Sequence, residues 1–128
     1  KLSIELNYSP VSVTIYGDVN QLQQVFLNMI LNAIDATADG GKIKITTTGV
    51  DDYAQIIFED TGCGIVPEDL DKIFEPFFTT KSPGKGTGLG LSICYGIIEE
   101  HKGKISVSSN GIGKGTAFTI SLPIYEKT

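Results

Sequence analysis

The sequence has few cysteines, no long apolar run and no excess of basic residues, and each absence excludes a class of protein. Cys63 and Cys94 are too few and too far apart for a disulfide framework or a four-ligand metal site, and we expect free thiols in a reducing cytoplasm. No apolar run approaches the ~20 residues that span a bilayer, and there is no signal peptide. The net charge of −5 argues against a nucleic-acid-binding surface.

The remaining composition is typical of one globular domain. With 128 residues, of which 41% are hydrophobic and 20% charged, the chain can form a core of ordinary composition. Because it begins directly in strand-like sequence, we expect residues 1–128 to be a single domain taken from a longer protein. It contains no internal repeat and no low-complexity tract.

The order of the predicted elements favours an α+β fold. Apolar residues at period two and at helical spacing predict strands at 3–8, 11–16, 42–50, 53–58, 104–109 and 116–122, and helices at 18–38, 67–74 and 87–101. Asp18 is expected to be the N-cap of the first helix, and Lys102-Gly103 is expected to end the last one. Few strands are joined by a helix, so we expect a two-layer α/β sandwich. Its sheet would be mixed, mostly antiparallel and of about five strands, with three helices on one face.

The most distinctive stretch alternates glycine with other residues before an apolar, helix-like segment: Lys81-Ser82-Pro83-Gly84-Lys85-Gly86-Thr87-Gly88-Leu89-Gly90-Leu91. A glycine-rich turn before a helix N-terminus suits phosphate, although a surface loop without a ligand fits the pattern equally well. A P-loop is excluded because Lys85 is followed by Gly86 instead of Ser or Thr. The dinucleotide fingerprint is excluded because Leu91 occupies its third glycine position and no strand precedes it.

The first predicted helix carries a polar stripe. Asn28, Asn32 and Asp35 fall at i, i+4 and i+7, roughly opposite the apolar face. Amide oxygens suit Mg²⁺, although a solvated polar face would give the same pattern.

Asp60 follows a strand and precedes two glycines, Gly62 and Gly64. A carboxylate there could accept a hydrogen bond from an exocyclic amine such as that of adenine, and the glycines would let a flat ring approach the backbone. An Asx-type turn accounts for the same residues.

Aromatic, hydroxyl and cationic side chains surround the glycine stretch, and each has a structural alternative. Phe74, Phe77 and Phe78 could cover a nucleotide or anchor the core. The neighbouring side chains either contact phosphate or are solvated: Thr79, Thr80, Lys81 and Lys85. His101, the only histidine, is best explained as a C-terminal helix cap.

In order and spacing, these features resemble the catalytic, ATP-binding domain of sensor histidine kinases, in the superfamily that includes gyrase, Hsp90 and MutL. The resemblance covers residues 18–123 and implies the Bergerat ATP-binding fold, with a short lid like that of nitrogen-regulation-type kinases. Five segments carry it: Asn28-Met-Ile-Leu-Asn32-Ala-Ile-Asp35-Ala36 (the asparagine box), Asp60-Thr-Gly62-Cys-Gly64-Ile65 (the first glycine box), Phe74-Glu-Pro-Phe77-Phe78 (the phenylalanine box), Gly84-Lys-Gly86-Thr-Gly88-Leu-Gly90-Leu (the second glycine box) and Gly113-Lys-Gly115-Thr116.

The resemblance implies a role for each matching position. Asp60 would bind the adenine amine, with Thr116 nearby through a water, while Asn32 would bind Mg²⁺ and Asn28 would help to hold the metal or phosphate. Asn28, Asn32, Lys81 and Lys85 would be catalytic. The implied nucleotide-binding set is Asn28, Asn32, Asp35, Asp60, Gly62, Gly64, Ile65, Phe77, Thr79, Thr80, Lys81, Gly84, Lys85, Gly86, Thr87, Gly88, Leu89, Gly90 and Thr116.

Two positions depart from related families. Many histidine kinases carry Lys in place of Asp35, so a phosphate-contacting cation is either missing or supplied by Lys81 or Lys85. Gyrase-like and Hsp90-like ATPases place a glutamate base at the position of Asn28, so fast intrinsic ATP hydrolysis is not expected here.

The implied activity is transfer of the γ-phosphate of Mg-ATP to a histidine on a separate helical hairpin of the same parent protein. That parent would be a homodimer that signals to a response regulator, whereas the isolated domain would be a cytoplasmic monomer without a nucleic-acid partner. The parent itself would be either cytoplasmic or an inner-membrane sensor. Two alternatives stay open: a serine kinase of the anti-sigma-factor type, and a non-catalytic ATP-sensing module.

Overall fold

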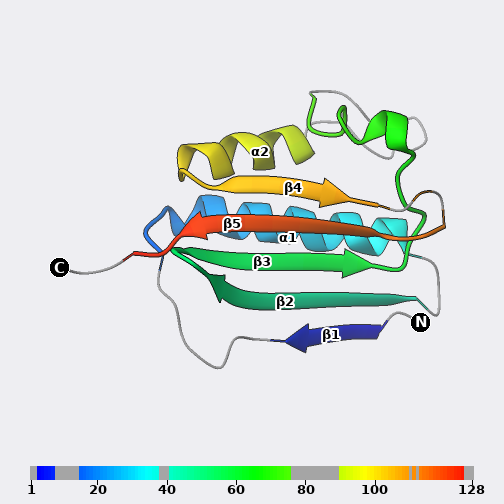
Figure 1. Ribbon diagram of the computed structural model, residues 1–128, viewed down its shortest axis with the longest axis horizontal. Helices are drawn as coiled ribbons and strands as arrows, with labels where there is room; N and C mark the ends of the chain where they lie inside the picture. The colour runs from blue at the N-terminus through cyan, green and yellow to red at the C-terminus, as the bar shows by residue number, and fades with distance from the viewer. Residues whose placement is uncertain are drawn as a thin grey trace.

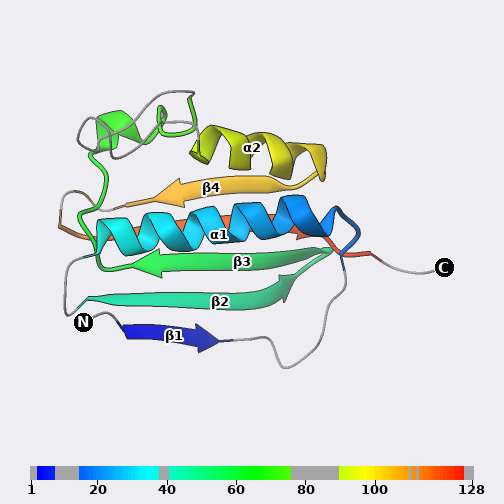
Figure 2. The ribbon, with the colours of Figure 1, turned by 180° about the vertical axis from the view of Figure 1, so that it is seen from behind.

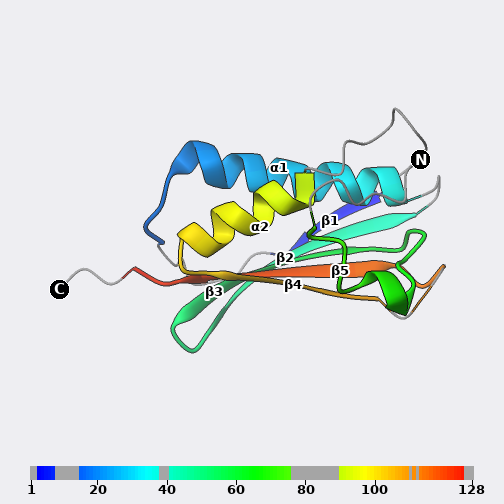
Figure 3. The ribbon, with the colours of Figure 1, turned by 90° about the horizontal axis from the view of Figure 1, so that it is seen from above.

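The computed structural model describes residues 3–7, 15–37, 41–75, 90–109, 111 and 113–125. Within these residues, two α-helices cover one face of a five-stranded sheet (Figure 1, Figure 3). From behind, α1 (Val19–Ala36) lies in front of β5 (Thr116–Pro123) (Figure 2). The predicted two-layer α+β sandwich is confirmed.

The sheet has the strand order β1-β2-β3-β5-β4. Only the β1–β2 pair is parallel within the described sheet, and every other neighbouring pair is antiparallel, which confirms a mixed, mostly antiparallel sheet. The strands are β1 (Ser3–Asn7), β2 (Lys42–Val50), β3 (Tyr53–Asp60), β4 (Lys104–Ser108) and β5 (Thr116–Pro123).

At the beginning of the chain, β1 forms within the predicted strand 3–8. β1 pairs with β2, a long-range contact that no local pattern could reveal. Most of the predicted strand 11–16 lies outside the described residues, and its Ile15 makes an isolated antiparallel bridge with Ile124.

The first helix, α1 (Val19–Ala36), begins where the sequence predicts. The Asp18 side chain accepts a hydrogen bond from the Gln21 N–H at 3.0 Å, so the predicted N-cap is confirmed. The helix ends two residues earlier than expected, because Thr37 is already extended and forms the C-cap.

The second helix, α2 (Gly90–Glu100), ends at the predicted Lys102-Gly103 pair. Lys102 has a φ of 61°, and the Gly103 N–H donates to the Ile98 carbonyl at 2.9 Å, as in a Schellman-type C-cap. Residues 87–89, which were also predicted to be helical, lie outside the described residues.

The third predicted helix, 67–74, is wrong in extent. Only η1 (Pro67–Asp69) forms, a single 3₁₀ turn with Pro67 at its first position, and it lies beyond β4 at the edge of the sheet (Figure 1). Ile73, further along the segment, is buried in the core, so core packing ties this segment down without a regular helix.

The core lies between the helix layer and the sheet. α1 lies over β3 and α2 over β4, so apolar side chains from both helices meet the alternating inward positions of the strands. The buried core consists of Leu22, Val25, Met29, Phe58, Ile73, Cys94, Ile97, Ile98, Ile105, Phe118, Ile120 and Leu122.

Candidate functional site

Asp60 is a half-buried carboxylate at the end of the central strand β3. It lies opposite Thr116 in the β3–β5 register, and its Oδ1 accepts a hydrogen bond from the Gly62 N–H at 2.9 Å. Burial raises the pKa of the Asp60 carboxyl above its ordinary value, while hydrogen bonds from the Gly62 and Thr116 backbone act in the opposite direction. The strand therefore holds the Asp60 carboxylate in a fixed position, and the hydrogen bonds from the protein do not fully offset the cost of burying its charge.

Three glycines near Asp60 let main-chain segments touch. A Cβ on Gly62 would lie 2.3 Å from the carbonyl oxygen of Ala36, at the end of α1. Gly64 (φ 73°) is similarly close to the Gly111 oxygen, and Gly115 (φ 78°) to the Asp60 oxygen. The sequence explained Gly62 and Gly64 by an approaching ligand, whereas the structure supplies a packing reason for both, and their ligand role stays a prediction.

Backbone hydrogen bonds join the loop after β3 to the neighbouring segments. The Cys63 N–H donates to the Ala36 carbonyl at 2.9 Å, which attaches the end of α1 to this loop. On the other side, the Gly113 N–H donates to the Cys63 carbonyl at 2.7 Å, and the Gly115 N–H donates to the Gly62 carbonyl at 3.2 Å. The end of α1, the first glycine box and the start of β5 are thereby brought to one end of the domain.

Ser109 completes this arrangement and was missed by sequence reasoning. Its Oγ accepts hydrogen bonds from the N–H groups of Ile65 (3.0 Å) and Gly111 (3.3 Å) and donates one to the Gly115 carbonyl (2.7 Å). The signal was present, because a serine directly after a strand and before a glycine-rich loop is a common turn former. Ser109 fixes the predicted site residue Ile65 against the loop that enters β5.

The polar stripe of α1 flanks the core instead of lying opposite it. Asn28 and Asn32 are half-buried, and Asp35 is exposed. The Asn28 Nδ2 donates to the buried Cys94 Sγ at 3.5 Å, so this side of α1 faces α2. The predicted orientation was wrong because the packing of α2 along the side of α1, which helical spacing cannot reveal, decides what that side faces.

Much of the predicted nucleotide-binding set lies outside the described residues: Phe77, Thr79, Thr80, Lys81, Gly84, Lys85, Gly86, Thr87, Gly88 and Leu89. Gly90 is the first residue of α2. Phe74 packs against the core, with ring centroids 5.4 Å from Tyr95 and 6.3 Å from Phe118, which supports its reading as a core anchor.

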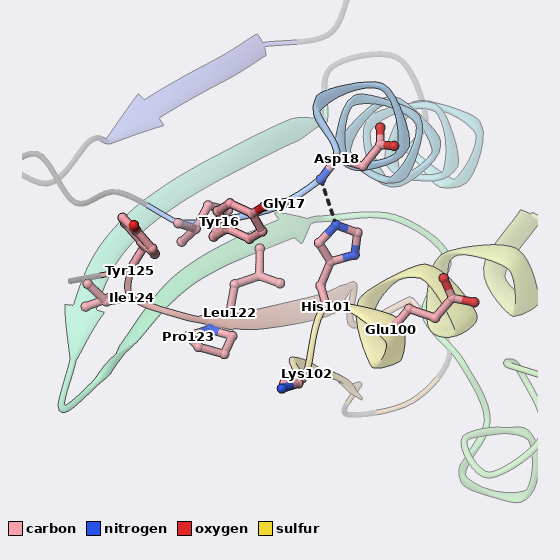
Figure 4. A pocket seen from close by; sticks show the side chains of 11 residues that line it. Tyr16, Gly17, Asp18, Glu100, His101, Lys102, Leu122, Pro123, Ile124 and Tyr125 are labelled. Atoms are coloured by element: carbon pink, nitrogen blue, oxygen red, sulfur yellow. Dashed lines mark hydrogen bonds between the residues drawn. The ribbon is translucent and has the colours of Figure 1, made fainter. Parts of the chain in front are cut away.

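Cavities lined by described residues lie at the two ends of the sheet. A cavity of about 150 Å³ borders the candidate site and is lined by Glu59, Asp60, Ser108, Ser109, Lys114, Gly115, Thr116 and Ala117. A larger one of about 690 Å³ lies where α1 begins and α2 ends, and its lining includes Tyr16, Asp18, His101 and Tyr125 (Figure 4). The larger cavity is lined by none of the predicted site residues, so its larger size does not identify it as the functional site.

His101, in the larger cavity, uses both ring nitrogens. Nδ1 donates to the Ile97 carbonyl at 2.8 Å, and Nε2 accepts from the Asp18 N–H at 3.0 Å (Figure 4). The first bond confirms the predicted capping role, and the second joins the end of α2 to the beginning of α1. A histidine with both nitrogens engaged is not available as a base or a phosphoacceptor in this conformation.

The described residues contain neither a membrane-crossing helix nor a cluster of three or more His, Cys, Asp or Glu side chains that could hold a metal.

Comparison of the sequence with known families gives a match over residues 17–126 to the family described as "Histidine kinase-, DNA gyrase B-, and HSP90-like ATPase". Sporulation kinase E of Bacillus subtilis (strain 168) is 49% identical over 113 residues, which cover 88% of this chain and 15% of that protein. Sporulation kinase A of the same organism is 47% identical over 120 residues, covering 94% of this chain and 19% of that protein. The chain thus spans less than a fifth of the length of these relatives.

Solved structures give the same match. The nucleotide-free catalytic domain of histidine kinase ThkA has a TM-score of 0.84 and 37% identity, covering 95% of this chain and 78% of that one. Full-length ShkA in complex with AMPPNP has a TM-score of 0.85 and 29% identity, covering 99% and 26% of the two chains. ThkA in complex with the response regulator TrrA has a TM-score of 0.81 and 34% identity, covering 97% and 34%.

Proposed function

Because this chain belongs to the family of histidine kinase-, DNA gyrase B- and HSP90-like ATPases, we propose that it is the ATP-binding catalytic domain of a sensor histidine kinase. In this role it binds Mg-ATP and offers the γ-phosphate to a histidine on a separate helical hairpin of the parent protein. The relatives named as kinases support the proposal, since they share up to 49% identity over most of this chain.

The observation that carries the proposal is the fixed Asp60 carboxylate. Gly62 holds Oδ1 at 2.9 Å, and Thr116 lies directly opposite on β5. A half-buried carboxylate with a raised pKa is stabilised by a further hydrogen-bond donor. The exocyclic amine of adenine is such a donor, and Thr116 would contribute through a water.

The asparagine pair of α1 fits a magnesium ion. Asn28 and Asn32 lie one turn apart, both are half-buried, and amide oxygens are ligands that Mg²⁺ accepts alongside water and phosphate oxygens. When bound, the cation would neutralise charge on the triphosphate. Lys81, Lys85 and the glycines of the second glycine box would contact the phosphates, and Asp35 would lie at the edge of this group.

The residues of the proposed site favour positioning of ATP over activation of a water molecule. Asn28 carries no carboxylate that could act as a base, so ATP hydrolysis by this chain should be slow. His101 already uses both nitrogens in holding α1 to α2, and the accepting histidine therefore belongs to the hairpin. The parent would be a homodimer and would pass the phosphoryl group to a response regulator, the kind of protein found in complex with ThkA.

The nucleotide assignment is tested with Asp60→Asn, which keeps the shape of the side chain and an oxygen for the Gly62 N–H. We expect calorimetry to show ATP binding by the wild-type chain and at least a tenfold weaker affinity for the variant, since a hydrogen bond to a charged group is worth about 1.5–3 kcal/mol. Equal affinities would contradict the assignment of Asp60 to adenine.

The reaction class is tested with [γ-³²P]ATP. The chain alone should stay unlabelled, and a phosphoacceptor hairpin supplied in trans should become labelled with a phosphate that acid removes. Strong labelling of the chain alone would refute transfer to a separate domain, and an acid-stable label would indicate a serine kinase.

A further inference from the structure

Asn28 is linked to the second helix by a buried thiol. Its Nδ2 donates to the Cys94 Sγ across 3.5 Å, and the Cys94 side chain has no solvent exposure. The thiol in turn donates to the carbonyl oxygen of Val25 on α1, 4.0 Å away. Cys94 therefore connects α2 to one of the two asparagines that we assign to the metal and phosphate.

The thiol contact selects one orientation of the Asn28 amide. A half-turn of the amide exchanges its oxygen and nitrogen, which are nearly equal in size, and only the oxygen can bind a cation. An acceptor for Nδ2 stabilises one of these orientations, and solvent does not reach Cys94 to compete. With Nδ2 engaged by Cys94, Oδ1 is the atom that Asn28 can offer to Mg²⁺.

The donors and acceptors of the two side chains fix the direction of both bonds. A protonated thiol has a single hydrogen, which Val25 accepts, so its lone pairs are left for Asn28. The reverse arrangement, in which the thiol donates to Oδ1, would turn Nδ2 towards the cation.

We propose that Cys94 is a positioning residue whose buried thiol holds the Asn28 amide with Oδ1 available to the magnesium ion of Mg-ATP. The inference rests on the proposed function. The competing explanation is a cysteine that only fills space, since Cys94 belongs to the apolar core. Side chains of similar size, with and without a hydrogen-bond acceptor, separate the two explanations.

The experiment compares Cys94→Val, which has no acceptor, with Cys94→Ser, which keeps an acceptor and a donor at this position. Ile98→Val is the matched control, because Ile98 is equally buried one turn further along α2 and takes no part in the hydrogen bond. The ATP affinity of each chain is measured by calorimetry over a series of Mg²⁺ concentrations and in EDTA.

Cys94→Val should weaken the Mg²⁺-dependent part of the ATP affinity by about 3- to 10-fold, the effect of one lost hydrogen bond, and leave the affinity in EDTA unchanged. Cys94→Ser should recover most of the loss, and Ile98→Val should keep the wild-type Mg²⁺ dependence. Unchanged Mg²⁺ dependence in Cys94→Val, or equal losses in the Val and Ser variants, would overturn the proposal. A wild-type chain that binds no ATP would instead refute the proposed function.

A second measurement needs no nucleotide. The side-chain ¹⁵N–¹H signals of Asn28, identified by their absence in Asn28→Asp, should shift in Cys94→Val and remain near their wild-type positions in Ile98→Val. If they do not move in Cys94→Val, the hydrogen bond is not formed in solution and the positioning role is wrong, whatever the ATP affinity.

Discussion

A methyl group added at Gly62 should destabilise the domain strongly, even though Gly62 does not have a positive φ. An alanine Cβ there would lie 2.3 Å from the carbonyl oxygen and 2.6 Å from the carbonyl carbon of Ala36. Both are backbone atoms, so no side chain can rotate away to relieve the overlap. The overlap can be relieved only if the end of α1 separates from the loop that follows β3.

The magnitude follows from the contacts that must give way. Overpacking of this kind costs about 1–3 kcal/mol. Movement of the loop also disturbs the 2.9 Å hydrogen bond from the Cys63 N–H to the Ala36 carbonyl, which adds about 1 kcal/mol. We expect Gly62→Ala to lose about 2–4 kcal/mol of unfolding free energy, which corresponds to a fall in Tm of about 6–15 °C for a domain of this size.

Urea titration and thermal unfolding, followed by circular dichroism, measure this loss. Gly96→Ala is the control, because a Cβ at this position in α2 meets no atom within 4 Å and alanine should stabilise the helix by about 0.5–1 kcal/mol. If Gly62→Ala stays within about 0.5 kcal/mol of the wild type while the control behaves as expected, the contact between Gly62 and α1 does not exist in solution.

Three further predictions concern other parts of the molecule. Gly17→Ala would place a Cβ 2.5 Å from the His101 ring and should lower the unfolding free energy by about 1–2 kcal/mol. In a His101→Ala background the same change should cost almost nothing, which a double-mutant cycle measured by urea unfolding would show, whereas additive effects would contradict the contact. Ser109→Ala leaves two backbone N–H groups without their acceptor and should lower the unfolding free energy by about 2–3 kcal/mol in the same assay. Ser108→Ala, at an exposed position, is the control and should be neutral, and an equally neutral Ser109→Ala would refute the role of Ser109. Because the pKa of Asp60 is raised in the folded state, the wild type loses stability as the pH rises through the folded-state pKa. Asp60→Asn should therefore be more stable than the wild type near pH 7 and lose this advantage on acidification towards the ordinary pKa of 3.8. A difference in Tm that does not depend on pH would contradict this prediction.

The sequence was most informative where local patterns decide the structure. Asp18 caps α1 as expected, because an aspartate before an amphipathic repeat satisfies the free N–H groups of the first turn. β2 has the predicted bounds, and Lys102 and Gly103 end α2 as predicted. The resemblance to histidine kinases drew attention to Gly62, Gly64 and Gly115 near Asp60, although it did not supply the packing reason for these glycines.

The predictions were wrong or incomplete where contacts between distant segments decide the structure. The polar stripe of Asn28 was placed opposite the core because the spacing cannot reveal that α2 packs along that side of α1. The segment after Pro67 forms one 3₁₀ turn, since Ile73 is fixed by the core and not by a regular helix. Ser109 was overlooked because its three partners come from two separate loops.

The place of β5 in the sheet has a consequence for folding kinetics. β5 comes last along the described chain, yet it lies between β3 and β4, so the pairing with β3 waits for the final strand to be inserted. Such a non-local pairing forms late and slowly, because loop-closure entropy must be overcome before its contacts stabilise the chain. Thr116, the residue opposite Asp60, is the first residue of this strand. An incompletely folded chain, during synthesis or after partial unfolding, therefore lacks one wall of the proposed nucleotide site, and under this proposal nucleotide binding becomes a marker of completed folding.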